Sequence, residues 1–200
     1  MLTMKDVIRE GHPTLREKAV AVKLPLDEDT KALLKEMRQF LIHSQDPAMV
    51  EQYDFRPGVG LAAPQVNRSL RAMAIYTTDE NYETLYDLVL INPVVLSHST
   101  RQTYMPGGEG CLSIDREVEG LVPRHHKITF KAHQYDPIED VLEEVTLTFK
   151  GFLAVVFQHE LDHLNGVLFP DRTEPMLEGI KPLEFKVIEE DEEKKEEATS

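Results

Sequence analysis

The sequence predicts an α+β fold in which mainly antiparallel sheets pack around a central buried helix. Five short segments in the middle of the chain are rich in β-branched or aromatic residues, and Pro, Gly, Asn and Asp separate them. A single apolar helical segment follows these segments. Strands in succession that precede one buried helix indicate an α+β domain, because the helix then buries its surface against the sheet.

The chain has 200 residues, which suits one domain with a single sizeable core. We expect residues 1–188 to form this domain and residues 189–200 to form an acidic tail. Positions 189–197 read EEDEEKKEE and carry a net charge of −5, out of −14 for the whole chain. A run without apolar residues gains too little free energy from burial to offset the conformational entropy lost on ordering, so a solvated, disordered tail is predicted. An interaction tail is the alternative.

The first regular element predicted is a helix over residues 27–43. Asp27 or Asp29 can cap it, and its apolar residues recur on one helical face. The polar stretch 44–57 has a proline near each end and predicts a loop, or an insertion that carries a short helix. The helix residues expected in the core are Leu33, Leu34, Met37, Phe40 and Leu41.

The remaining elements are five strands and a second helix. The strands are predicted over 71–77, 85–91, 94–97, 127–133 and 141–149. The helix is predicted over 152–164, where glycine and proline are absent and apolar residues occupy more than one face. Asn165 and Gly166 supply a left-handed stop signal for it. The segment 181–188 predicts a last strand.

The second helix carries the motif His159-Glu160-Leu161-Asp162-His163. Residues four apart share one face of a helix, so the two imidazoles can bind one metal ion, while Glu160 handles the proton of a metal-bound water. The six residues before Gln158 are all apolar. The polar groups of the motif would therefore be buried, and a metal would satisfy them. Two helical histidines that merely share this spacing are the alternative.

A catalytic metal site of this kind usually has a third protein ligand. No histidine follows His163, and Phe169 stands where a metzincin would have its third histidine. A downstream acid such as Glu184 could serve, but Cys111 in GGEGCLSID is the better candidate. The glycines around it permit close approach, and a Cys-His-His set suits a tetrahedral divalent metal. His125 and His126 are expected outside the site, and Glu109 is expected to be structural.

A third block, GVGLAAPQ at residues 58–65, contains small residues and one amide donor, Gln65. Small residues permit close approach of a ligand backbone. Clusters of glycine and alanine more often reflect tight packing than binding, so this block by itself is only a weak signal for a binding site.

The blocks GVGLAAPQ (58–65), EGCLS (109–113) and QHELDHLNG (158–166) together resemble peptide deformylase. The resemblance extends to IREGHPTLR (8–16) and FPDR (169–172), and the long connection 44–57 is similar to the second bacterial subtype. It implies a metal-dependent hydrolase that removes the N-terminal formyl group from formylmethionine of nascent polypeptides and releases formate. It also implies that residues 1–188 are one catalytic domain.

The resemblance also implies roles for individual residues. Cys111, His159 and His163 match the ligands of one divalent metal, and Glu160 matches the general acid/base. Gln65 and the backbone N–H of Leu112 match the oxyanion donors. The implied metal is Fe²⁺, with Zn²⁺, Ni²⁺ or Co²⁺ able to substitute.

A pocket for the methionine side chain is expected beside the metal, because residues three and four before His159 share its helical face. The substrate backbone would add as a strand along 58–60 and 107–110, which tolerates many sequences because only main-chain bonds form. The expected substrate-binding residues are Gly58, Val59, Gly60, Gly110, Leu112, Val155 and Val156.

The acidic composition argues against direct DNA binding and against an anionic membrane surface, and no apolar run reaches the roughly 18 residues of a membrane-spanning helix. One cysteine requires no oxidising compartment, and no secretory signal is evident, so a cytoplasmic protein is expected. The expected partners are N-formylmethionyl nascent peptides at the ribosome, and the expected state is a monomer. An H-E-x-x-H peptidase and a non-catalytic metal-binding or ribosome-associated module are the alternative functions.

Overall fold

The computed structural model of the chain describes residues 1–78 and 84–185. Its main element is a five-stranded antiparallel sheet with the order β1-β2-β3-β6-β7, and β4 and β5 pair in a second, antiparallel sheet. A mixed architecture of helices and antiparallel sheets is therefore confirmed. The strands are β1 Gly60–Ala62, β2 Ala72–Thr78, β3 Thr84–His98, β4 Gln102–Thr103, β5 Arg124–His125, β6 Lys127–Asp136 and β7 Val141–Lys150.

The described residues contain three α-helices: α1 Glu28–Gln45, α2 Pro47–Tyr53 and α3 Phe152–Leu164. Asp27 caps α1 by accepting a hydrogen bond from the Thr30 N–H at 2.7 Å, and all five predicted core residues of α1 are buried. The connection after α1 carries the short helix α2, which is the second of the two predicted alternatives. The observed bounds of α3 match the prediction, and Gly166, with φ +73°, follows its end.

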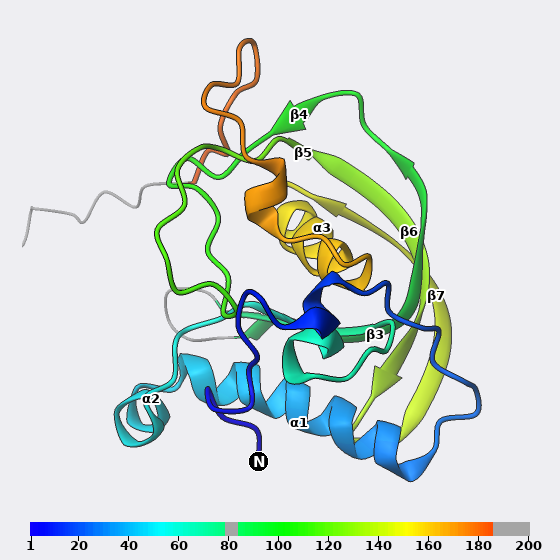
Figure 1. Ribbon diagram of the computed structural model, residues 1–200. Coiled ribbons are helices and arrows are strands. Elements are labelled where there is room, and N and C mark those ends of the chain that lie inside the picture. Colours follow the sequence, from blue (N-terminus) through cyan, green and yellow to red (C-terminus); the bar gives the residue numbers. More distant parts are fainter. Residues whose placement is uncertain (79–83, 186–200) are drawn as a thin grey trace, which may run out of the picture.

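Two helices cover opposite faces of the sheet because side chains alternate along each strand. On β2, Ala72 and Ala74 belong to the core that contains α1, whereas Met73 and Ile75 belong to the core that contains α3. Figure 1 shows α1 running beneath the sheet and α3 on its other side. Eleven of the thirteen residues of α3 are buried. The H-E-x-x-H motif therefore lies inside the molecule.

The structure corrects two predicted strands. Segments 85–91 and 94–97 belong to the single strand β3, whose register shifts between Ile91 and Val94. Asn92 has a φ of +53° there, which asparagine tolerates, and the following proline has no N–H to pair. The Asn92 side chain also makes two hydrogen bonds with the backbone of Val22: it accepts one from the Val22 N–H and donates one to the Val22 carbonyl.

The strand predicted over residues 181–188 was wrong for residues 181–185, the part of it that the structure describes. Residues 181–185 form no strand, although the Leu183 N–H donates to the Tyr104 carbonyl at 2.9 Å. Pro182 lacks the N–H that a regular ladder would need. The rest of the predicted strand and the acidic tail 189–200 lie outside the described residues. Among the described helices, none combines the length and apolarity that membrane crossing requires.

Candidate metal and catalytic site

Cys111, His159 and His163 meet in the interior of the protein. One ligand atom from each lies within 4.8 Å of the others, and all three residues are buried. The Cys111 Sγ is 3.3 Å from the His163 Nε2. Helix α3 presents both histidines one turn apart, while the cysteine comes from the loop between β4 and β5. The structure thus brings together the three residues that the sequence nominated as ligands.

The donor atoms of this cluster fit a divalent cation. Glu109 Oε2 lies 2.8 Å from the His159 Nδ1, so this nitrogen donates and leaves the Nε2 lone pair free for a metal. Burial and the neighbouring His159 lower the pKa of His163 well below its usual value, which favours the neutral, metal-binding imidazole. Burial would lower the pKa of His159, but its hydrogen bonds with Cys111 and Glu109 raise that pKa well above its usual value, so a cation would bind here by displacing a proton. A thiolate with two neutral imidazoles would then be a tetrahedral donor set with a fourth position open.

An ion-pair network, buried except for Arg172, packs behind the cluster. Arg124 donates to Glu109 at 2.7 and 2.8 Å and to Asp162 at 2.6 Å, and Arg172 donates to Asp162 at 2.6 and 2.7 Å. Burial alone would raise the pKa of Glu109, but hydrogen bonds from Arg124 and His159 outweigh it and lower the pKa to about 2. Glu109 therefore stays a carboxylate and accepts from His159.

Sequence reasoning missed most of this network. Glu109 was expected to be structural, and Arg124 and Asp162 were not singled out. One feature of the sequence could have indicated it. Asp162 is a second acid in a helix that is mostly apolar, and a buried carboxylate needs a positively charged or hydrogen-bonding partner. His125 lies outside the described metal cluster: its ring stacks on that of His98, with the ring centroids 3.6 Å apart, and its Nδ1 is 2.8 Å from the Ser99 carbonyl.

Glu160 is buried beside the cluster. Its Oε2 has no hydrogen-bond partner within the described part of the chain, and burial raises its pKa to about 7 although His159 opposes this. Its other oxygen lies against the backbone of β1, where a Cβ on Gly60 would be only 2.3 Å from Oε1. The carboxyl group therefore has a buried oxygen that no described residue satisfies, and its position depends on a glycine.

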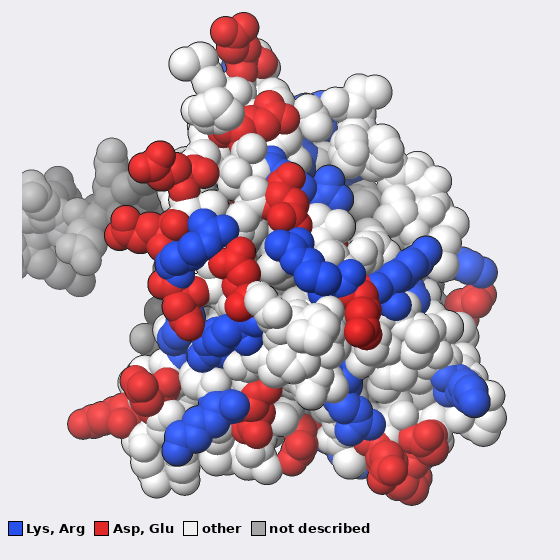
Figure 2. All heavy atoms as spheres, viewed as in Figure 1, with Lys and Arg blue, Asp and Glu red and all other residues white. Residues whose placement is uncertain are grey.

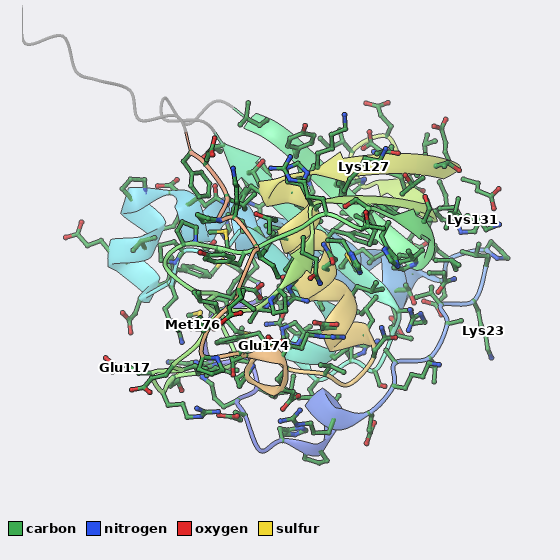
Figure 3. All side chains as sticks on the ribbon, turned by 90° about the horizontal axis from the view of Figure 1, so that it is seen from above. Lys23, Glu117, Lys127, Lys131, Glu174 and Met176 are labelled. Atoms are coloured by element: carbon green, nitrogen blue, oxygen red, sulfur yellow. The ribbon has the colours of Figure 1, made fainter. Side chains whose placement is uncertain are left out.

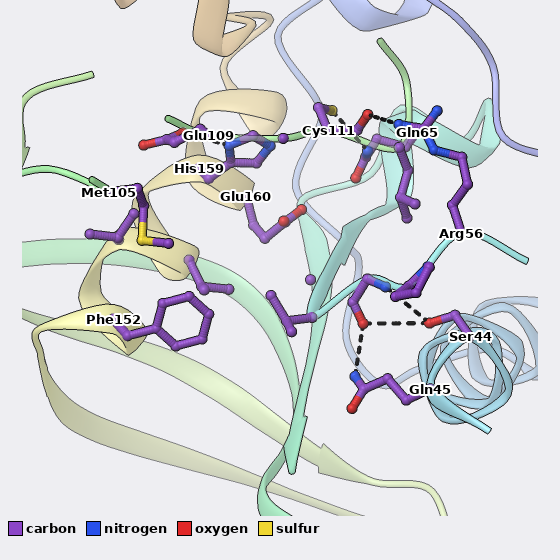
Figure 4. Close-up of a pocket in the computed structure, with 18 of the residues that line it drawn as sticks. Ser44, Gln45, Arg56, Gln65, Met105, Glu109, Cys111, Phe152, His159 and Glu160 are labelled. Atoms are coloured by element: carbon purple, nitrogen blue, oxygen red, sulfur yellow. Dashed lines mark hydrogen bonds and ion pairs between the residues drawn. The ribbon is translucent and has the colours of Figure 1, made fainter. Parts of the chain in front are cut away.

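Gln65 points its amide nitrogen at the same cluster. The Ala62 N–H donates to the Gln65 Oε1 at 2.9 Å, and this fixes which end of the amide faces inward. The Gln65 Nε2 is consequently 3.3 Å from the Ser113 Oγ and 3.5 Å from the Cys111 Sγ. Figure 4 shows Gln65 and Cys111 close together on one side of the pocket. A donor thus faces the region beside the ligands.

A cavity of about 720 Å³ opens onto this site. Its apolar wall includes Val155 and Val156 on α3, with Phe152 and Met105, which the sequence did not nominate. Its far end reaches the junction of α1 and α2. Figure 4 shows Phe152 and Met105 across the pocket from Gln45 and Arg56. The residues expected to bind substrate that line it are Gly58, Val59, Gly60, Gly110, Leu112, Val155 and Val156.

A family model described as polypeptide deformylase matches residues 4–178. The chain belongs to the peptide deformylase family. A peptide deformylase of Halalkalibacterium halodurans is 55% identical over 90% of this chain and 96% of its own length. The Bacillus cereus protein named peptide deformylase 2 is 56% identical over 86% of this chain and 90% of its own length.

Solved structures of the family agree with this membership. The Met-Ala-Ser-bound crystal structure of the class I type b peptide deformylase from Acinetobacter baumannii matches with a TM-score of 0.63 and 30% identity, over 83% of this chain and 96% of that one. Peptide deformylase membership makes the chain an enzyme and supports removal of an N-terminal formyl group as its activity. It accounts for all the motifs together, which neither an H-E-x-x-H peptidase nor a non-catalytic module does.

We expect Gly60→Ala to reduce turnover of this deformylase at least about tenfold, because the new Cβ would displace the Glu160 carboxyl group. Overpacking of this kind also costs about 1–3 kcal/mol of stability. The matched variant is Gly58→Ala, whose Cβ meets the flexible end of Leu112 at 3.1 Å. Its effect on kcat should be smaller, and equal effects in the two variants would contradict this explanation. Steady-state kinetics and thermal melting measure both quantities.

Proposed function

We propose that this enzyme removes the formyl group from N-terminal formylmethionine of nascent peptides in a metal-dependent hydrolysis that releases formate. One observation carries the proposal: Glu160 and the Gln65 amide face the Cys111-His159-His163 cluster at the base of one cavity. A general base and a hydrogen-bond donor next to a possible Lewis acid are the parts that amide hydrolysis needs.

We propose that Cys111, His159 and His163 hold the cation, with Fe²⁺ as the metal and Zn²⁺, Ni²⁺ or Co²⁺ as substitutes. When bound, such a cation polarises a carbonyl and acidifies water. The mixed sulfur and nitrogen donor set, all of it buried, supports a metal of this group over magnesium or calcium, which prefer oxygen ligands.

Glu160 is the residue that moves the proton. Its carboxylate accepts a proton from the water that attacks the formyl carbon and then gives this proton to the amine nitrogen as the carbon–nitrogen bond breaks. The products are formate and a free amino terminus. Burial beside the cluster raises the pKa of this carboxyl group to about 7, and a pKa near neutrality supports a role in both accepting and returning a proton.

Gln65 and the Leu112 N–H are proposed to donate to the oxygen that becomes negative during attack. We expect Gln65→Ala to lower kcat by about 10²–10³, the usual cost of losing one oxyanion donor, with little change in KM. Gln65→Glu keeps the shape but replaces the donor by an acceptor, and should be at least as damaging. Wild-type kcat in Gln65→Ala would exclude this role for the side chain.

The apolar wall of the cavity supports selection of the methionine side chain. Val155 and Val156 line it beside His159, and burial of a methionine side chain contributes roughly 1.5–3 kcal/mol. The glycine backbone at 58–60 could pair with the substrate main chain, so that many nascent peptides would fit.

We also propose that the enzyme is a cytoplasmic monomer whose residues 1–188 form one catalytic domain and which meets its substrates at the ribosome. Acidic and basic side chains are interspersed on the face shown in Figure 2. Figure 3 shows Lys23, Lys127 and Lys131 towards one side of the molecule, and Glu117 and Met176 towards the other. A small local basic patch, rather than a broad basic surface, is therefore the proposed ribosome contact.

The decisive experiment is an anaerobic formate-release assay on formyl-Met-Ala-Ser beside acetyl-Met-Ala-Ser. We expect formate from the first peptide and no deacylation of the second. Equal turnover of both peptides, or of neither, would refute the proposed function.

A further inference from the structure

The Leu112 N–H belongs to a turn formed by residues 111–114, and an arginine from another part of the chain also binds this turn. The Ile114 N–H donates to the Cys111 carbonyl at 3.2 Å and closes the turn. The Cys111 carbonyl and the Leu112 N–H are the two ends of one planar peptide group and point in opposite directions. Any contact that fixes the carbonyl oxygen of Cys111 therefore also fixes the direction of the Leu112 N–H.

Arg56 makes such a contact from a distant part of the chain. Its Nη2 donates to the carbonyls of Cys111 at 3.1 Å and Ile114 at 3.3 Å, and its Nη1 donates to Asp115 at 2.7 Å. One guanidinium thus holds both ends of the turn. Figure 4 shows Arg56 reaching towards the Gln65 and Cys111 side of the pocket. The rigid fork of arginine suits three acceptors at once, which a lysine ammonium does not.

The charge of Arg56 adds a second effect. A guanidinium is permanently positive, and it lies on the oxygen end of the Cys111–Leu112 peptide. Hydrogen bonds along a chain polarise one another, so this contact strengthens the N–H at the other end as a donor. Arg56 therefore acts on both the direction and the strength of the Leu112 N–H.

We propose that Arg56 is a positioning residue for deformylation, which holds the Cys111–Leu112 peptide so that the Leu112 N–H meets the developing oxyanion. This inference rests on the proposed function, in which that N–H is a donor. Arg56 belongs to the connection between α2 and β1. The long connection after α1 would then support the catalytic turn as well as line the cavity.

Arg9 offers a matched control. Its Nε donates to the other oxygen of Asp115 at 3.0 Å, and its remaining contacts are with the carbonyls of Val7 and Met4. The two arginine side chains are similarly exposed, at 36% for Arg9 and 44% for Arg56. Arg9 shares the Asp115 contact, but within the described residues it makes no hydrogen bond to the turn carbonyls. Arg9→Ala therefore removes the contacts with Asp115, Val7 and Met4 and leaves the contacts on the turn carbonyls in place.

The kinetic test compares Arg56→Ala with Arg9→Ala on formyl-Met-Ala-Ser. Because an oxyanion exists only in the transition state, we expect Arg56→Ala to lower kcat at least about tenfold while KM changes less than about threefold. Arg9→Ala should keep kcat within about twofold. Low concentrations of guanidinium ion should restore part of the kcat of Arg56→Ala and none in Arg9→Ala. Arg56→Lys should stay impaired, because one ammonium cannot reach all three acceptors.

A second readout does not depend on activity. The backbone ¹⁵N–¹H resonance of Leu112 should shift in Arg56→Ala and stay in place in Arg9→Ala. An unmoved resonance, an unchanged kcat, or equal losses in both arginine variants would overturn the inference. Should Arg56→Ala fail to fold, Arg56→Lys serves in its place under the same criteria. If the wild-type enzyme releases no formate, the proposed function fails, whereas the resonance still tests whether Arg56 orients this peptide.

Discussion

Replacing Glu160 by glutamine is expected to lower kcat by about 10²–10⁴, the usual contribution of a general acid–base residue. Glutamine keeps the volume of the side chain against Gly60 but cannot accept and return a proton. The three residues proposed to bind the metal are untouched, so the metal content should stay at one ion per chain. The variant should therefore be a folded, metal-loaded and inactive protein.

The melting temperature of Glu160→Gln gives a second measurement for the same prediction. A buried carboxyl oxygen without a partner is costly, and a neutral amide relieves part of that cost, so the melting temperature should stay equal or rise. Glu139→Gln, in the exposed turn between β6 and β7, is the matched control and should change neither kcat nor melting. Substantial activity in Glu160→Gln, with metal bound, would assign proton transfer to another group.

The second large effect is expected for Cys111→Ala, which should lose the metal and, with it, the activity. Loss of an outer-sphere partner alone typically costs 10–100-fold in metal affinity, so loss of a ligand should cost at least about 100-fold. Elemental analysis after dialysis, together with titration of Co²⁺ followed by its thiolate absorption, measures this directly. The protein should stay folded, because alanine fits a site that holds a small buried thiol.

This variant also decides between ligand sets. Glu184, the downstream acid that the sequence left open, is exposed and is not part of the described metal cluster. Full retention of one metal ion in Cys111→Ala would nevertheless show that the third ligand is not the cysteine. His133→Ala, which removes a histidine of β6 outside the cluster, should keep both the metal and the activity.

Local features of this protein could be predicted from the sequence because they depend on neighbours along the chain. The five core residues of α1, its Asp27 cap and the bounds of α3 follow from helical periodicity and capping chemistry. The spacing of His159 and His163 on one face follows from the same periodicity. Even the choice of Cys111 rested on ligand chemistry and on a family resemblance, rather than on any view of its position.

The tertiary structure alone decided how distant segments meet. It showed that Gly60 is needed because Glu160 lies against it, and that Arg124 joins Glu109 to Asp162 behind the ligands. It also placed Arg56 on the turn that carries Leu112. These contacts join residues from 15 to 100 positions apart along the chain. Strand register and packing on the two faces of the sheet set such contacts, and neither is encoded in a local pattern of residue types.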